Sequence, residues 1–329
     1  MTDFRTKVKL PEFEIRIDHW TSVLCVGSCF AEHIYRKLTD HKFSAFLNQF
    51  GILYNPAVIS DALDMLSYEK PIPDIELFFY QELWHSFAHH GHFSHPDKEQ
   101  ALLAIKSKLE AGRDFLTETT TLIITLGTAH VYVFKKTGKI VANCHKIPAA
   151  SFSRRMLTVD EIVKSLGASF EKMKREQPQL DIILAVSPVR HLRDGLVTNQ
   201  RSKATLVLAA AALCSNHDYV HYFPSYEIVL DELRDYRFYE EDMAHPNKIA
   251  VDYIWSAFSE AFFTPPTRAL AKRIGNITQA ARHKPFHPPT QAHQHFIRQQ
   301  LLQIEALEKE YRFINFDEEI ANFKKYLIE

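Results

Sequence analysis

The apolar positions of this chain follow two alternating patterns. Short runs of consecutive apolar residues, typical of buried strands, recur at 21–28, 43–47, 121–127, 181–188 and 218–225. Apolar residues three and four apart predict helices between them, at 29–40, 98–111, 159–176 and 199–215. A hairpin is expected over 131–144, turning at Thr137-Gly138. Strands that are apolar throughout and alternate with helices favour an α/β fold with a mostly parallel sheet.

The pattern changes after about residue 263. Proline and histidine become frequent, and the chain then turns polar and helical. Its apolar side chains fall near helical spacing at Ile297, Leu301, Leu302, Ile304, Leu307 and Tyr311. We therefore expect a main domain over 1–263 and a C-terminal helical extension over 264–329. The extension would pack either on the core or on a second subunit, which would make a homodimer.

Charge and composition exclude several classes of protein. The 329 residues carry 39 Lys and Arg against 40 Asp and Glu, so nothing in the net charge of −1 favours nucleic acid or an anionic membrane as partner. No apolar run approaches the roughly 20 residues of a membrane span, and the N-terminus lacks an apolar signal segment. The four cysteines (Cys25, Cys29, Cys144, Cys214) form no CxxC pair. A cytoplasmic globular protein is expected.

Ser28 is the first candidate for chemistry. It stands between a predicted strand and a predicted helix, at the edge where open parallel sheets bind ligands. A serine there could attack a carbonyl, and its own N–H, at a helix N-terminus, could stabilise the oxyanion. The alternative is an ordinary helix N-cap. Cys29 is a rival nucleophile, although a small buried cysteine explains it better.

A serine nucleophile needs a base, and the segment 240–258 offers one among the 18 histidines. Asp242 and His245 lie three residues apart, and Pro246 suits the first position of a following helix. The carboxylate of Asp242 could accept from Nδ1–H of His245, leaving Nε2 to take the proton of Ser28. The alternative is an N-capping aspartate beside an exposed histidine.

The sequence GSCFA at 27–31, together with the late Asp-x-x-His-Pro, resembles the GSCFA family, a branch of the SGNH (GDSL-like) hydrolases. The resemblance spans about 18–260 and includes FGILYNP (50–56), TLGTAHVY (125–132), VANCHKIP (141–148) and SPVRHLRDG (187–195). It implies a three-layer, flavodoxin-like α/β/α fold and no metal or other cofactor. It also implies Ser28 as nucleophile, His245 as base and Asp242 as orienting carboxylate, in a hydrolase or O-acyltransferase acting on an acyl ester, for example one linked to a carbohydrate.

The oxyanion hole is where the sequence departs from the SGNH pattern. That pattern uses the N–H of the nucleophile, here Ser28, a glycine N–H after the second strand, here Gly51, and an asparagine in a later block. The corresponding block, Gly127-Thr128-Ala129, has no asparagine. Thr128 could donate through its hydroxyl or N–H, or Asn55 could supply the amide. Losing one such donor typically costs about 10²–10³ in rate. Turn chemistry before Pro56 would equally explain Gly51 and Asn55.

Two further segments could bind substrate. The segment 84–96 holds five histidines, His85, His89, His90, His92 and His95. They could bind a metal, but we expect a substrate-lining loop with His89 or His90 near the active site. Arg190 and His191 follow a predicted strand at the ligand-binding edge. Arg190 could bind a carboxylate or phosphate through two hydrogen bonds, or form a structural salt bridge.

A non-catalytic binding or scaffold protein on a degenerate core is the competing hypothesis. The missing asparagine favours it. The presence of Ser28, Asp242 and His245 argues against it.

Overall fold

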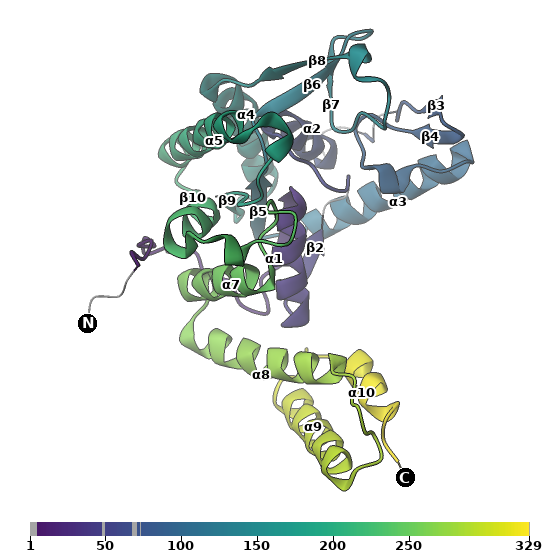
Figure 1. Ribbon diagram of the computed structural model, residues 1–329, viewed down its shortest axis with the longest axis vertical. Helices are drawn as coiled ribbons and strands as arrows, with labels where there is room; N and C mark the ends of the chain where they lie inside the picture. Colours follow the sequence, from purple (N-terminus) through teal and green to yellow (C-terminus); the bar gives the residue numbers. More distant parts are fainter. Residues whose placement is uncertain (1–4, 48–49, 68–70, 73, 329) are drawn as a thin grey trace.

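The fold is described from a computed structural model, which places residues 5–47, 50–67, 71–72 and 74–328. Its centre is a five-stranded sheet in the order β10-β9-β5-β1-β2, in which every neighbouring pair is parallel (Figure 1). The strands are β1 (Val23–Gly27), β2 (Ala45–Leu47), β5 (Thr121–Leu126), β9 (Asp181–Val186) and β10 (Val220–Tyr222). The predicted parallel α/β sheet is confirmed.

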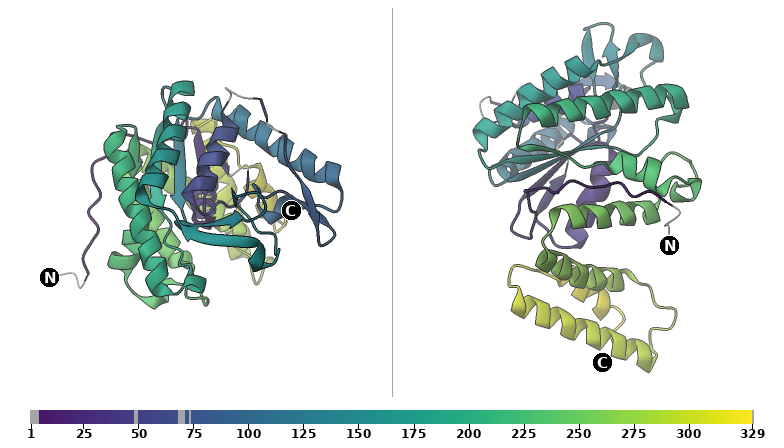
Figure 2. Two further views of the ribbon diagram at one scale, coloured as in Figure 1. Left: turned by 90° about the horizontal axis from the view of Figure 1, so that it is seen from above. Right: turned by 90° about the vertical axis from the view of Figure 1, so that its left-hand side faces the viewer.

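Helices cover both faces of this sheet and complete three layers (Figures 1 and 2). One face carries α2 (Pro56–Leu66), α4 (Val159–Glu176) and α5 (Leu196–Asn216), with α3 (Lys98–Leu116) alongside; the other carries α1 (Cys29–Asp40) and α7 (Lys248–Phe262). Within the described residues, no helix combines the length and apolar character needed to cross a bilayer.

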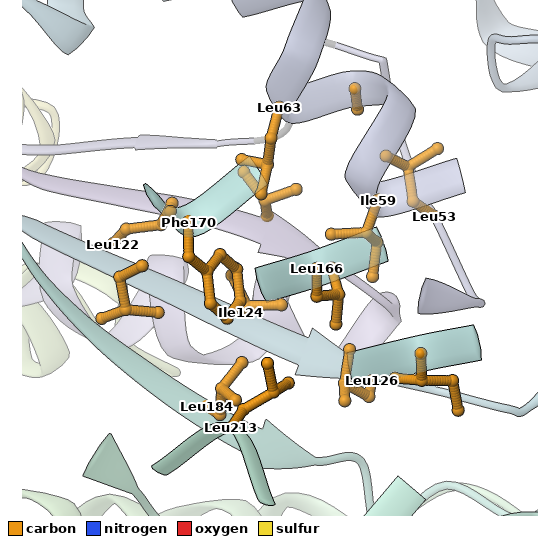
Figure 3. Close-up of a cluster of buried hydrophobic side chains, with 14 of the residues drawn as sticks. Leu53, Ile59, Leu63, Leu122, Ile124, Leu126, Leu166, Phe170, Leu184 and Leu213 are labelled. Carbon is orange, nitrogen blue, oxygen red and sulfur yellow. The ribbon is translucent and has the colours of Figure 1, made fainter. Parts of the chain in front are cut away.

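The strands are apolar throughout because both of their faces are buried. In β1, Leu24 and Val26 pack in the cluster under α2, α4 and α5, whereas Val23 and Cys25 pack against α1 and α7. Figure 3 shows the first cluster, where strand leucines and isoleucines meet Phe170 of α4. Alternate side chains of a strand point to opposite faces, so a strand with helices on both sides needs no polar positions.

Two small antiparallel sheets flank the main one. The predicted hairpin forms as β6 (His130–Phe134) and β7 (Lys139–Val141), with Gly138 in the left-handed region at φ 69°. The pattern did not reveal its third strand, β8 (Phe152–Met156), nor the hairpin of β3 (Phe78–Tyr80) and β4 (Leu83–His85). β8 is largely solvent-exposed, and β3 and β4 are three residues each and mostly half-buried, so none of them carries a buried apolar run.

Short helical turns connect the main elements. They are η1 (Gly91–Phe93), η2 (Ala149–Ser151), η3 (Leu192–Asp194), α6 (Ser225–Glu227), η4 (Ile228–Leu233) and η5 (Tyr236–Phe238).

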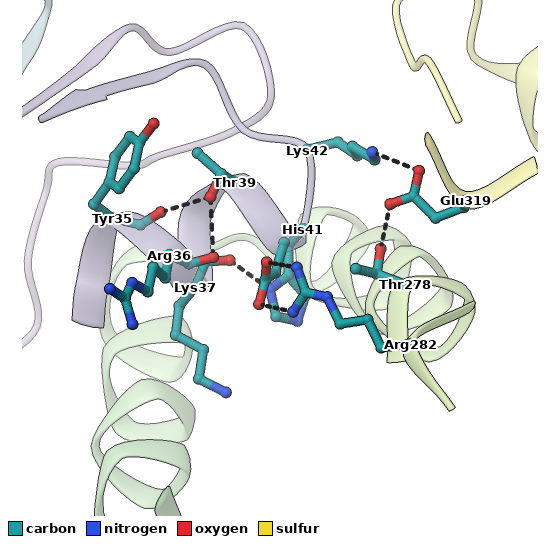
Figure 4. A network of polar contacts seen from close by, with 10 residues as sticks. Tyr35, Arg36, Lys37, Thr39, His41, Lys42, Thr278, Arg282 and Glu319 are labelled. Atoms are coloured by element: carbon teal, nitrogen blue, oxygen red, sulfur yellow. Dashed lines mark hydrogen bonds and ion pairs between the residues drawn. The ribbon is translucent and has the colours of Figure 1, made fainter. Parts of the chain in front are cut away.

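The C-terminal residues form α8 (Pro265–Arg282), α9 (Gln291–Glu310) and α10 (Asp317–Lys324) around an apolar cluster of their own. Of the predicted stripe, Ile297, Ile304 and Leu307 are buried there, while Leu302 is exposed. Ion pairs hold this unit against the end of α1 (Figure 4): Lys42 Nζ lies 2.8 Å from Glu319, and Arg282 pairs with Asp40. The homodimer stays a prediction.

Candidate functional site

Ser28 lies at the carboxyl edge of the sheet, between β1 and α1. It is the N-cap of α1: its Oγ accepts from the N–H of Phe30 at 3.3 Å. The residue before it, Gly27, has φ 133°, and a Cβ there would meet the Thr125 carbonyl oxygen at 2.3 Å. Only glycine therefore permits this close approach of β1 and β5. Ser28 thus lies at the end of a strand, as predicted, and it is also the helix N-cap that the alternative interpretation proposed.

Thr125 of β5 holds both polar groups of Ser28. The two hydroxyl oxygens are 2.9 Å apart, and the Ser28 N–H donates to the Thr125 carbonyl at 3.0 Å. Only 1% of Ser28 is exposed. The family resemblance assigns the Ser28 N–H to an oxyanion hole. In this conformation that N–H is instead bonded to the Thr125 carbonyl of β5.

Asp242 and His245 form a compact pair on the loop before α7. Asp242 Oδ2 lies 2.5 Å from His245 Nδ1, and Oδ1 accepts the N–H groups of Ala244 and His245 at 2.9 and 3.0 Å. These hydrogen bonds, chiefly those from His245, lower the pKa of Asp242 to about 2. His245 Nε2 has no hydrogen-bond partner among the residues the structure describes. The predicted pairing through Nδ1 matches this geometry.

The prediction that Pro246 begins the next helix is wrong. Asn247 is the N-cap of α7, because its side-chain oxygen accepts from the N–H of Ala250 at 3.1 Å, and the helix starts at Lys248. Pro246 instead bridges to Tyr239. The helix therefore begins two residues after the position that the proline indicated.

The loop with His245 lies at the same edge of the sheet as Ser28, but the two side chains share no hydrogen bond. The carbonyl of Ala244 accepts from the N–H of Arg190, just after β9, at 3.0 Å. His33, on α1 five residues after Ser28, has its pKa lowered by burial and, among smaller causes, by the charge of His245. In the described part of the chain, no hydrogen bond joins Ser28 Oγ to His245 Nε2.

The segment before α2 carries two of the predicted oxyanion donors. Its Leu53 N–H donates to the Gly27 carbonyl at 2.8 Å, which holds the segment beside the end of β1. Asn55 is the N-cap of α2, accepting from Val58 N–H at 3.1 Å, so the turn interpretation is also right. Its Nδ2 has no partner within the described chain. Gly51 has φ 76°, and a Cβ there would collide with His90.

The backbone N–H and the hydroxyl of Thr128 both make hydrogen bonds within the protein. Its N–H and that of Gly127 donate to the Tyr54 carbonyl at 2.9 and 2.8 Å, and its hydroxyl lies 3.0 Å from that of Ser202. Thr128 therefore holds two loops together and offers no free donor to a ligand.

Arg190 lies over aromatic rings. Its guanidinium carbon is 4.1 Å from the ring centre of Tyr239 and 5.1 Å from that of Tyr236. No carboxylate of the described residues pairs with it, so the structural salt bridge expected as an alternative is not observed. His191 donates its N–H to Asn199 at 2.9 Å and sets its ring edge-on to Tyr54.

The histidines of 84–96 divide between two environments. His89 is 2% exposed, stacks on Phe50 and contacts the Ser86 hydroxyl through Nδ1 at 2.8 Å. Burial lowers its pKa to about 4. His90 is half-buried, with Nδ1 3.0 Å from that of His92. Over the described residues, no group of three or more His, Cys, Asp or Glu side chains is arranged to hold a metal ion.

Sequence reasoning missed a polar face of α5. Lys203 is fully buried, and its Nζ donates to the carbonyls of Gly127 and Ser187, both at 2.6 Å. Burial lowers its pKa to about 7. Ser202 accepts from Ala129 N–H at 2.8 Å, and Asn199 holds His191. The available signal was the spacing of Asn199, Ser202 and Lys203, three and four apart in an alanine-rich helix.

Comparisons with known proteins agree with the resemblance noted in the sequence. The model of the GSCFA family matches residues 22–258, and that of the GSCFA domain protein, C-terminal domain, matches residues 274–329. No curated protein matches.

Two solved structures match this chain at low identity. One is a proposed platelet activating factor from Streptococcus pneumonia: 14% identity over 72% of this chain and 83% of that one, TM-score 0.37. The other is a Clostridium thermocellum family 3 carbohydrate esterase: 12% identity over 76% of this chain and 99% of that one, TM-score 0.32. Because the family model covers most of the sequence, the chain belongs to the GSCFA family.

Proposed function

We propose that this protein is a serine-dependent ester hydrolase or O-acyltransferase of the SGNH type, acting on an acyl ester through Ser28, His245 and Asp242. The observation that carries the proposal is the Asp242–His245 pair, with Nδ1 held at 2.5 Å and Nε2 unoccupied within the described chain. A carboxylate at Nδ1 fixes the tautomer in which Nε2 can accept a proton.

The reaction begins with rotation of the Ser28 side chain away from Thr125. The hydroxyl proton passes to His245 Nε2 as Oγ attacks the ester carbonyl carbon. The tetrahedral intermediate collapses, the bond to the leaving alkoxide breaks, and His245 returns the proton to it. Water or an acceptor hydroxyl then gives its proton to His245 Nε2 and attacks the acyl carbonyl. The bond from the acyl group to Ser28 Oγ breaks, and His245 returns the proton to Oγ, which gives hydrolysis or acyl transfer. Asp242 stabilises the imidazolium in both halves of the reaction.

The oxyanion in this mechanism is stabilised by Asn55 and Gly51. The Nδ2 of Asn55 and the N–H of Gly51 have no partner in the described part of the chain, whereas the donors of Thr128 are occupied. The Ser28 N–H contributes only after its bond to the Thr125 carbonyl breaks. Each missing donor lowers the rate by about 10²–10³, so turnover of simple esters is slow.

Cys29 does not fit the role of nucleophile. Burial raises the pKa of its thiol, which disfavours the reactive thiolate. Exchange of Cys29 for alanine therefore leaves activity in place, and Cys29→Ala is the neighbouring control for Ser28→Ala.

A fluorophosphonate probe tests the proposal. Wild type and Cys29→Ala should be labelled, while Ser28→Ala should not, and His245→Ala should react far more slowly. The same proteins are then compared on p-nitrophenyl acetate and butyrate. If Ser28→Ala is still labelled, Ser28 is not the nucleophile and the proposal is wrong.

A binding protein on a degenerate core is the second candidate, and one observation favours it. Thr125 engages both polar groups of Ser28, and the residue is almost inaccessible. A wild-type protein that remains unlabelled at high probe concentration would support this candidate over the enzyme.

A further inference from the structure

A cavity of about 770 Å³ lies between α2, the end of α3 and the two small hairpins. Its wall is mainly aromatic and aliphatic, from residues such as Phe50, Val58, Met65, Phe78, Phe87 and Ile140. Ser28, Asp242 and His245 do not line it. Phe50, however, begins the segment that leads to Gly51 and Asn55 beside Ser28. The volume is in the range of small-molecule sites.

One buried polar atom in this wall is left without a partner. His89 lines the cavity at 2% exposure, and its Nε2 makes no hydrogen bond in the structure. A buried polar atom left unpaired costs about 1–3 kcal/mol. A ligand that pairs with Nε2 removes that cost.

The hydrogen bonds around His89 indicate whether its Nε2 is a donor or an acceptor. The Ser86 hydroxyl accepts from Ala88 N–H at 3.3 Å, and its own hydrogen has one acceptor in reach among the described residues, His89 Nδ1 at 2.8 Å. We assign the ring hydrogen to Nε2, because this tautomer gives the Ser86 hydroxyl an acceptor at His89 Nδ1. With the pKa of His89 at about 4, the imidazole is neutral near pH 7. The cavity thus presents an uncharged donor to a ligand oxygen.

The charges around the cavity select against anions. Asp61, Asp64, Asp74 and Glu76 line it, against two cations. Arg113 is occupied by the Met65 carbonyl at 2.7 Å, and Lys139 lies 3.9 Å from Glu76. Asp64 lies 3.7 Å from Lys172, which leaves Asp61 and Asp74 without a cation partner among the described residues. Asp61 is exposed at the cavity wall, and partial burial and the nearby Asp64 raise its pKa. Carboxylates so placed suit hydroxyl donors and repel carboxylate or phosphate.

We propose that this cavity binds a neutral acyl ester of a polyol. The acyl chain packs on Phe50, Phe78 and Ile140, the ester carbonyl accepts from His89 Nε2–H, and a polyol hydroxyl donates to Asp61. A ligand held in this way lies outside the Ser28 site, so the cavity is a binding site separate from the proposed active site. Binding itself needs none of the catalytic groups.

The test is calorimetric titration of the full-length Ser28→Ala protein, which cannot turn the ligand over, with 1-monooctanoylglycerol below its micellar concentration. We expect saturable binding at one site per chain. Octanoate, which has the same chain and a negative charge, should bind at least tenfold more weakly, and glycerol should give no heat of binding.

Three second-site variants in the Ser28→Ala background locate the ligand. His89→Phe keeps the ring on Phe50 and removes the donor, so affinity should fall about fivefold to tenfold. Ile140→Trp fills the cavity and should abolish binding. His95→Phe, an exposed histidine outside the cavity, should bind like the parent. Melting temperatures confirm that each variant is folded.

Absence of binding in the parent, unchanged affinity in His89→Phe or Ile140→Trp, or equal affinity for octanoate would each overturn this proposal. The proposed function fails separately. A wild type that binds the ester but resists the fluorophosphonate probe keeps the cavity proposal and removes the serine mechanism. A wild type that is labelled but binds no ester keeps the serine mechanism and removes the cavity proposal.

Discussion

At the scale of single residues, the site depends on which hydrogen-bond donors are already used. Asn55 combines two roles in one side chain: Oδ1 caps α2, and Nδ2 remains unpaired within the described residues. Aspartate in its place keeps the capping oxygen and lacks the amide hydrogens. This separates a role in catalysis from a role in folding.

We expect Asn55→Asp to lower kcat for p-nitrophenyl acetate by about 10²–10³, with a melting temperature close to that of the wild type. Asn55→Ala should show the same loss of rate and an additional destabilisation of about 1 kcal/mol, from the lost cap. Steady-state kinetics and thermal melts check both. Full activity of Asn55→Asp would remove Asn55 from the oxyanion hole.

Thr125 holds the hydroxyl of the candidate nucleophile in a conformation without a hydrogen bond to His245. Thr125→Val keeps the shape of the buried side chain and removes the hydroxyl, so Ser28 should rotate more freely. A hydrogen bond of about 1 kcal/mol corresponds to roughly fivefold in population, and the rate of fluorophosphonate labelling should rise by about that factor. A slower rate would mean that Thr125 positions Ser28 for reaction.

At the scale of elements, α5 connects the loops that follow two strands of the sheet. Lys203 bonds the Gly127 carbonyl after β5 and the Ser187 carbonyl after β9, and Ser202 bonds the loop of Thr128 and Ala129. These loops also carry Arg190, whose N–H holds the loop with His245. One helix face thus positions several parts of the candidate site.

Lys203→Met should destabilise the protein by about 2–4 kcal/mol, because two buried carbonyls lose their donor. Urea unfolding measures the change, and Lys164→Met, at an exposed position of α4, is the control and should alter stability little. Equal stability of both variants would show that the carbonyls find other partners.

The same element scale shows how far local pattern can predict this fold. The helix at 29–40 was predicted with its observed bounds, because its cap, Ser28, and its buried stripe, Phe30, Ile34 and Leu38, are local in sequence. The strands β3, β4 and β8 were not predicted, because none of them contains a buried apolar run: β3 and β4 are three residues each and pair with one another, and β8 pairs with β6.

At the scale of the whole molecule, buried histidines couple stability to pH. His89 and His145 are buried, and burial lowers both pKa values to about 4, from an ordinary value of 6.5. The unfolded chain protonates these rings below pH 6.5, while the folded protein keeps them neutral down to about pH 4. The unfolded state binds more protons in that window, so stability falls as the pH is lowered through it.

We expect the unfolding free energy to decrease between pH 6.5 and pH 4 by roughly 1–3 kcal/mol for each ring. His89→Phe should show a smaller decrease, and His95→Phe, which changes an exposed ring, should follow the wild type. Chemical denaturation at several pH values measures the three curves. Parallel curves for wild type and His89→Phe would contradict the assignment.

By itself, the sequence determined the parallel α/β architecture, the place of Ser28 at the end of a strand and the pairing of Asp242 with His245. These depend on apolar periodicity, on caps and on residues three apart, all of which are local. Only the tertiary structure showed that Thr125 holds Ser28, that Lys203 joins two strand ends and that His89 lines a cavity. Those contacts join segments up to 97 residues apart in the chain, and chain folding, not local pattern, brings them together.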